Sequence, residues 1–243
     1  MEYNDFHNKL EEDLIEYGIP YDKKTIKDDS KKLYEYMEYI LKTNKYINLT
    51  AIKDSETFFK KHIIDSLYIL KYIDEILGDE KDSSTSFLDI GTGGGFPLVP
   101  IHIIKNYNSF GLDSVLKKLK VIADKEDINI IHGRAEILAH DEKYREKFDL
   151  VTSRALSSLK NVIEYSGGFV KCENYVILMR GKKEKIDNEI EDTINKCSFE
   201  LVKQEEYELY GESRSVVILK KVNKLNKNLP NKNSKHYKSK VVK

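Results

Sequence analysis

The sequence predicts an α/β fold: a mostly parallel β-sheet with helices on both faces, preceded by a helical segment and closed by an antiparallel hairpin. After residue 86, short apolar runs alternate with segments of helical length, which is the pattern of a parallel sheet crossed by helices. The predicted strands occupy residues 87–90, 110–113, 128–131, 148–151 and 175–179. The helices that follow them are predicted over residues 97–105, 114–124, 157–170 and 182–197.

Two further patterns define the ends of the chain. Residues 199–209 and 213–221 are strand-like and separated by three residues, so we expect them to form a hairpin. Before the sheet, apolar side chains recur at helical spacing, for example at Leu33, Met37 and Ile40. We therefore expect an N-terminal helical extension over residues 1–80, a ligand-binding core over residues 81–222 and a basic, flexible tail over residues 223–243.

Composition narrows the class of protein. The 243 residues are 40% hydrophobic and 34% charged, which allows a sizeable core. The two cysteines, Cys172 and Cys197, lie in no CxxC pair, so neither a disulfide framework nor a metal site is expected. We expect a cytoplasmic protein, because the chain starts without a signal peptide and contains no membrane-length apolar run. Nine lysines and no acid lie between residues 220 and 243, and this asymmetry favours an anionic partner.

The strongest local motif is the glycine-rich run Asp89-Ile90-Gly91-Thr92-Gly93-Gly94-Gly95-Phe96-Pro97, between a predicted strand and a predicted helix. A dinucleotide-binding G-x-G-x-x-G loop would need glycine where Phe96 stands. The D-x-G-x-G-x-G form instead resembles the loop that binds S-adenosylmethionine, a cofactor without a pyrophosphate. We expect Gly91 and Gly93 to contribute to cofactor binding, and an ordinary glycine-rich turn is the alternative.

The other candidate residues follow later strands. Asp113 lies 22 residues after Gly91, where an acid can accept both ribose hydroxyls of an adenosine or can cap the next helix. Ala135 would let a flat adenine ring lie against the backbone, and Glu136 could fix that turn. Arg154, at the end of the fourth strand, is a candidate for positioning substrate or cofactor, with a surface charge as the alternative. His62 and Asp65 share a helix face and are expected to form a hydrogen-bonded pair.

Absent motifs also restrict the chemistry. Methyltransferases that act on exocyclic amines resemble [DNS]-P-P-[YF] after the fourth strand, and the cytosine-C5 enzymes use a Pro-Cys nucleophile. Here Thr152-Ser153-Arg154-Ala155 follows instead, and no cysteine follows a proline.

Several motifs together resemble one family, the ribosomal RNA small subunit methyltransferase G family, also called the glucose-inhibited division protein B family. They are Asn48-Leu49-Thr50, His62-x-x-Asp65-Ser66-Leu67, the glycine-rich run, Leu112-Asp113-Ser114 with Lys117-Lys118, and Ser153-Arg154-Ala155. The likeness extends from about residue 33 to about residue 221. Three departures are Leu98 in place of a common glycine, Arg180-Gly181 in place of Lys-Gly, and a C-terminus that is only loosely similar.

The resemblance implies a Rossmann-like class I S-adenosylmethionine-dependent methyltransferase whose core spans residues 81–222. It implies N7-methylation of one guanine in 16S ribosomal RNA, with the small ribosomal subunit as partner. We expect the protein to act as a monomer. It also implies cofactor contacts at Gly91, Phe96, Ala135, Glu136 and Arg154.

Guanine N7 carries an in-plane lone pair, so no general base and no covalent cysteine are expected, and no side chain is assigned a catalytic role. The target base is expected to lie in a loop or to be extruded from a helix. Lys60-Lys61, Lys117-Lys118 and Lys182-Lys183 are candidate phosphate contacts or solvated surface charges. Two other readings remain open: a methyltransferase acting on a small molecule or a protein, and a binding module that has lost turnover.

Overall fold

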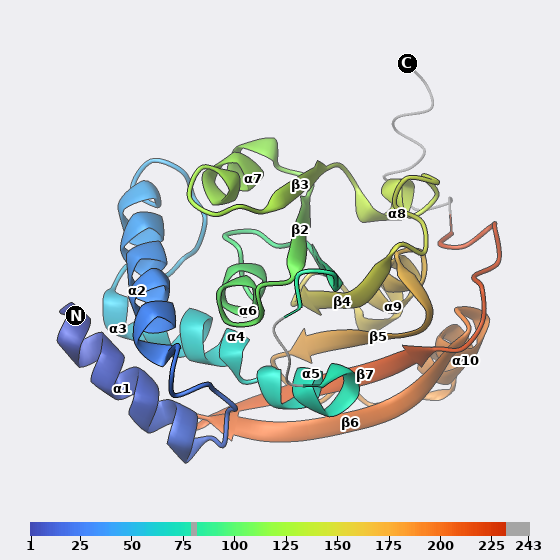
Figure 1. Ribbon diagram of the computed structural model, residues 1–243. Helices are drawn as coiled ribbons and strands as arrows, with labels where there is room; N and C mark the ends of the chain where they lie inside the picture. The colour runs from blue at the N-terminus through green and yellow to red at the C-terminus, as the bar shows by residue number, and fades with distance from the viewer. Residues whose placement is uncertain (79–81, 232–243) are drawn as a thin grey trace.

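The computed structural model describes residues 1–78 and 82–231. Its centre is a seven-stranded sheet in the order β3-β2-β1-β4-β5-β7-β6 (Figure 1). All neighbouring strands are parallel except the β5–β7 and β7–β6 pairs. The strands are β1 Ser86–Ile90, β2 Asn108–Asp113, β3 Asn129–His132, β4 Phe148–Arg154, β5 Val170–Arg180, β6 Phe199–Leu209 and β7 Glu212–Lys221. The predicted mostly parallel sheet with a C-terminal antiparallel hairpin is therefore confirmed.

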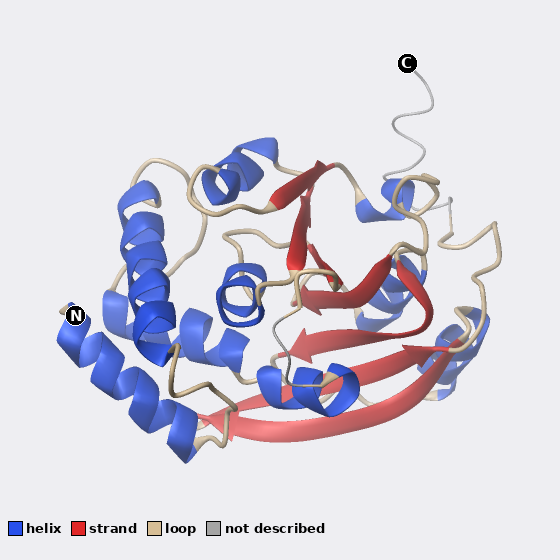
Figure 2. Cartoon of the chain, in the orientation of Figure 1, coloured by secondary structure: helices blue, strands red, loops and turns tan. Residues whose placement is uncertain are grey.

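Helices cover both faces of the sheet (Figure 2). The segment before the sheet forms α1 Tyr3–Glu16, α2 Ile26–Thr43, α3 Ser55–Phe58, a π-helical turn η1 Phe59–Ile64, α4 Asp65–Leu67 and α5 Leu70–Leu77. The helices between and after the parallel strands are α6 Leu98–Lys105, α7 Leu116–Ala123, α8 Ala135–Leu138, α9 Leu159–Gly167 and α10 Asn188–Lys196. Among the helices described, none is long and apolar enough to cross a membrane.

Two hydrophobic clusters follow from the alternation of side chains along the strands. Phe87 and Ile177 belong to a cluster that also contains buried residues of α1, α2, α5 and α6. Their neighbours Leu88 and Val176 belong to the opposite cluster, together with buried residues of α9 and α10. The N-terminal helices therefore share their core with the sheet and do not enclose a separate one. The domain limits predicted from the sequence stay a prediction.

The first part of the expected tail packs against the body of the protein. Arg145 donates hydrogen bonds to the carbonyls of Leu225, Asn226 and Leu229 at 3.0–3.2 Å. The Leu225 side chain is buried in the cluster that contains α9. This differs from the expectation of a flexible segment from residue 223, because apolar Leu225 and the guanidinium of Arg145 anchor it. Residues 232–243 of the predicted tail lie outside the described residues.

Candidate active site

The glycine-rich loop connects β1 to α6 at the carboxyl edge of the parallel strands, where α/β proteins bind their ligands. Gly91 and Gly95 have φ angles of 75° and 88°, which side chains with a Cβ rarely adopt. A Cβ at Gly91 would lie 2.5 Å from Cδ1 of Leu156. A side chain at this position would therefore strain the backbone and require the Leu156 side chain to move.

Asp113 holds the loop from the end of the neighbouring strand. Its Oδ2 accepts a hydrogen bond from the backbone N–H of Gly93 at 3.0 Å, and its Oδ1 accepts one from the N–H of Val115 at 2.8 Å. The carboxylate thus fixes both the glycine-rich loop and the residue that precedes α7. A carboxylate has about four acceptor sites, so these two bonds leave acceptor capacity for further donors.

Asp89 lies in β1, just before the glycine-rich loop, and its side chain helps to hold the strand that leads into the loop. The sequence did not indicate this contribution. Its buried carboxylate accepts a hydrogen bond from the hydroxyl of Thr152 at 2.8 Å, which joins β1 to β4. Burial raises the pKa of Asp89 to about 6, because the charged form is poorly solvated there.

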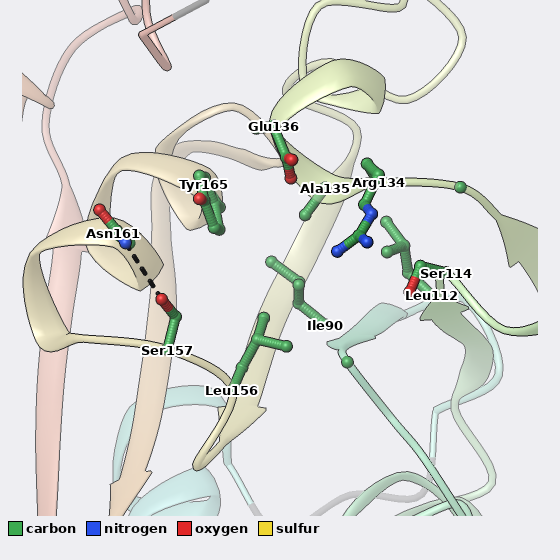
Figure 3. A pocket seen from close by; sticks show the side chains of 12 residues that line it. Ile90, Leu112, Ser114, Arg134, Ala135, Glu136, Leu156, Ser157, Asn161 and Tyr165 are labelled. Atoms are coloured by element: carbon green, nitrogen blue, oxygen red, sulfur yellow. Dashed lines mark hydrogen bonds between the residues drawn. The ribbon is translucent and has the colours of Figure 1, made fainter. Parts of the chain in front are cut away.

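A cavity of about 510 Å³, here the first cavity, opens between the glycine-rich loop, α8 and α9 (Figure 3). Ile90 and Leu156 supply apolar walls, and the carboxylate of Glu136 lies across from them near Tyr165. Asn161 Nδ2 donates to Ser157 Oγ at 3.1 Å on the α9 side. The complete lining is Ile90, Gly91, Leu112, Ser114, Gly133, Arg134, Ala135, Glu136, Leu156, Ser157, Asn161 and Tyr165.

A second cavity of about 300 Å³ lies on the other side of the segment that follows β4. Arg154 and Ala155 line this second cavity, whereas Leu156 and Ser157 line the first. Arg180 joins the two, because it lines the second cavity and donates to the carbonyl of Ser157 at 2.8 Å. The lining is Ile52, Lys61, His62, Asp65, Arg154, Ala155, Met179, Arg180, Gly181, Tyr207 and Arg214.

Asp65 joins two arginines in this second cavity. Its Oδ2 accepts from Arg154 Nη1 at 3.0 Å, and its Oδ1 accepts from Arg214 Nε at 3.0 Å. The Asp65 side chain is only 8% exposed, and each arginine side chain is 19% exposed. One buried carboxylate from the N-terminal helices therefore orients an arginine on β4 and another on β7.

His62 contacts the same arginine. Its Nδ1 lies 3.0 Å from Arg154 Nη2, and its Nε2 lies 2.7 Å from the hydroxyl of Thr50. A guanidinium only donates, so Nδ1 must accept and the ring proton must be on Nε2. Burial, followed by the charge of Arg154, lowers the pKa of His62 to about 3. The expected direct pair of His62 and Asp65 is therefore corrected, because Arg154 lies between them and bonds to both.

Phe96 connects the glycine-rich loop to the second cavity. Its ring stacks on that of His62 with centroids 4.5 Å apart and an interplanar angle of 9°. The guanidinium of Arg154 lies 5.7 Å from the centroid of the Phe96 ring. Tyr36 packs edge-on against the Phe96 ring, and its buried hydroxyl donates a hydrogen bond to the carbonyl of Gly94 at 2.9 Å.

The structure divides the seven predicted site residues into three groups. Gly91, Ala135 and Glu136 line the first cavity. The backbone N–H of Gly93, within the loop, donates a hydrogen bond to the carboxylate of Asp113. Phe96 packs against His62, and Arg154 lines the second cavity.

Several lining residues were missed by sequence reasoning, among them Leu156, Asn161 and Tyr165 of the first cavity and Tyr207 and Arg214 of the second. Leu156 directly follows the Ser-Arg-Ala motif at the end of β4, which was the available signal, whereas Asn161 and Tyr165 lie further on, in α9. Arg214 of the second cavity carried no local signal.

A parallel sheet closed by an antiparallel hairpin, with a glycine-rich loop and a ligand-sized cavity after its first strand, defines the class I S-adenosylmethionine-dependent methyltransferases. The family model described as GidB, rRNA small subunit methyltransferase G, matches residues 29–236. The chain belongs to this family of rRNA methyltransferases.

Individual relatives agree with the family model. The ribosomal RNA small subunit methyltransferase G of Clostridium novyi (strain NT) is 34% identical over 219 residues, covering 84% of this chain and 87% of the relative. The protein of the same name from Clostridium tetani (strain Massachusetts / E88) is 32% identical over 246 residues, covering 96% and 94%. A chain from the complex of the Haloferax volcanii Trm112 methyltransferase activator with a methyltransferase has a TM-score of 0.52 at 12% identity, covering 69% of this chain and 93% of that one. This last likeness shows the fold alone.

Proposed function

We propose that the protein transfers the methyl group of S-adenosylmethionine to N7 of a guanine in the 16S rRNA of the small ribosomal subunit. The observation that carries the proposal is the pair of adjoining cavities at the carboxyl edge of the sheet, separated by residues 154–157. We also propose that the enzyme acts as a monomer. The substrate places this activity in the cytoplasm.

The first cavity has the chemistry that the cofactor requires. Gly91 provides close backbone approach, Ala135 provides a small side chain next to a flat ring, and Glu136 provides a buried carboxylate. Asp113 retains acceptor capacity for ribose hydroxyls, while the hydrogen bond from Gly93 to Asp113 and the stacking of Phe96 on His62 fix the loop that would hold the cofactor. The bound cofactor supplies an electrophilic methyl group on a positively charged sulfur.

Arg154 lies at the boundary between the two cavities. It lines the second cavity, immediately before the residues that line the first, so it can position either the cofactor carboxylate or the target nucleotide. Its two partners, the buried Asp65 and the half-buried His62, fix its orientation before any ligand arrives. Such preorganisation favours reaction by holding the reacting atoms in place.

The proposed methyl transfer does not require a side chain that acts as an acid or a base. N7 of guanine carries its own lone pair, so no proton has to leave before it attacks the methyl carbon. His62 is held neutral with its Nδ1 lone pair occupied by Arg154, so it is a positioning residue and not a general base. N7 in A-form RNA lies in a deep, narrow groove, so the guanine must leave its helix or lie in a loop to reach the cavity.

The test is methyl transfer from radiolabelled S-adenosylmethionine to small ribosomal subunits that lack native base methylation, followed by mapping of the labelled nucleoside. The matched control uses fully methylated subunits. The proposal predicts label on N7 of one guanine in the unmethylated subunits and none in the control. Label on another atom or on a protein, or no label on any rRNA despite measurable cofactor binding, would contradict it.

A further inference from the structure

The two cavities differ in charge. The first cavity is lined by one cation, Arg134, and one acid, Glu136, so its formal charges cancel. The second is lined by four cations and one acid, with His62 neutral. The cations are Lys61, Arg154, Arg180 and Arg214, and the acid is Asp65. Ion pairs with Glu212 and Glu184 offset these cations in part, and the positive charge that remains in the second cavity attracts an anionic ligand.

The two arginines that bond to Asp65 keep donors for a ligand. A guanidinium has five N–H donors. Within the part of the chain that is described, hydrogen bonds occupy three on Arg154, to Lys61, Asp65 and His62. They likewise occupy three on Arg214, to Asp65, Ser213 and Glu212. Two donors on each arginine therefore stay available, on side chains whose orientation is already fixed.

Tyr207 adds a second, independent sign of a ligand. It lines the cavity and is 8% exposed, and its hydroxyl is buried with no hydrogen-bond partner among residues 1–78 and 82–231. Its ring is stacked on Tyr68 with centroids 3.9 Å apart, so the side chain is held in place. Buried hydroxyls are normally hydrogen-bonded, and a ligand with polar atoms could supply the missing partner here.

The remaining walls suit a flat, apolar ring. Ile52, Ala155 and Met179 contribute apolar surface to the same cavity. Its volume of about 300 Å³ falls at the small end of the range for ligand sites. One cavity thus combines apolar walls, an unpartnered phenol and oriented guanidinium groups.

We propose that the second cavity is a nucleotide-binding site that holds the target nucleotide with its base on the apolar walls and its phosphate on Arg214 and Lys61. The proposal rests on the proposed function, since it names where the RNA nucleotide enters. Both cations now pair with Glu212, at 2.8 Å from Arg214 Nη2 and 2.6 Å from Lys61 Nζ. Exposed ion pairs of this kind are weak, so a phosphate can replace the Glu212 carboxylate.

The experiment compares guanosine 5′-monophosphate with guanosine as probes of the full-length protein, using isothermal titration calorimetry. A phosphate that contacts charged donors should make the nucleotide bind about tenfold or more tightly than the nucleoside. Lys61→Gln and Arg214→Lys should each reduce this preference severalfold. Lys203→Gln removes an exposed ion pair to Glu75 elsewhere on the protein and should leave it unchanged.

Lys61→Gln keeps the test decisive if Arg214→Lys fails to fold, because the Lys61 side chain is 44% exposed. Three results would overturn the proposal: no measurable nucleotide binding, equal affinity for the nucleotide and nucleoside, or a preference unchanged in a folded Lys61→Gln protein. Displacement of the nucleotide by S-adenosylhomocysteine would also overturn it, since that places the nucleotide in the first cavity. Methyl transfer to rRNA without nucleotide selectivity would refute this site alone, whereas selective binding without transfer would refute the proposed function.

Discussion

Replacing Asp65 with asparagine measures how much the buried carboxylate between Arg154 and Arg214 stabilises the protein. Asparagine keeps the size and one acceptor oxygen but removes the charge and one of the two bonds, each of which is 3.0 Å long. Breaking a buried ion pair by removing one partner costs about 3–5 kcal/mol. The arginines are 19% exposed, so water solvates them in part, and we expect a loss near the lower end, about 3 kcal/mol.

The assay is urea unfolding followed by circular dichroism, with Glu212→Gln as the matched control. Glu212 pairs with the same Arg214, but its side chain is 44% exposed, so its loss should cost less than about 1 kcal/mol. For a chain of this length, about 3 kcal/mol corresponds to a melting temperature lower by roughly 6–12 °C.

Equal losses of stability in Asp65→Asn and Glu212→Gln would refute the reasoning. That result would mean that burial does not distinguish the two carboxylates, and that Arg154 and Arg214 are held by other contacts.

Three further predictions concern the loop and its supports. Tyr36→Phe leaves a buried carbonyl of the glycine-rich loop without its donor, so the free energy of unfolding should fall by about 1–2 kcal/mol in urea titrations, and an unchanged value would contradict this. His62 stays neutral in the folded protein down to a pKa of about 3 but takes up a proton near pH 6.5 when unfolded. Stability should therefore fall as the pH drops from 6.5 toward 3, and His62→Gln should lose less between pH 7 and pH 5; parallel losses would exclude the assignment. Gly91→Ala adds a Cβ at 2.5 Å from Leu156 at a φ of 75°, so calorimetry should show weaker S-adenosylmethionine binding, while Gly181→Ala, with no atom within 4 Å of its added Cβ, should bind normally.

The sheet could be predicted because its signals are local. Each parallel strand is a short apolar run, and each is followed by a segment with helical spacing. The predicted ends of strands and helices were less accurate where polar residues interrupt the apolar pattern. Strand β5 begins at Val170, five residues before the predicted Tyr175. The mostly polar residues 171–174 hide the start of the strand, because they interrupt the apolar run where the register shifts against β4. Helix α10 begins at Asn188 and not at Lys182, since the Asp187 side chain caps it by accepting from the N–H of Ile190.

The site residues fall into two groups: those that a local sequence motif predicts, and those that are brought together only by contacts between distant parts of the chain. Gly91, Asp113 and Ala135 could be found because each lies at or shortly after the end of a strand, and parallel strands end at one edge of the sheet. The partners of Arg154 could not, because Asp65 lies 89 residues away along the chain and comes from another element. Arg214 lies 149 residues from Asp65, and no motif marks it. Pairings of this kind depend on tertiary packing, which one sequence does not encode as a pattern.

The wide separation of these partners sets an order of assembly during synthesis. A growing chain that has passed residue 180 already contains every residue that lines the first cavity. The second cavity also needs Tyr207 and Arg214, which belong to the last hairpin. While that hairpin is still inside the ribosome, Asp65 has only one of its two arginines. The second cavity is thus among the last parts of the molecule to be completed as it leaves the ribosome that makes it.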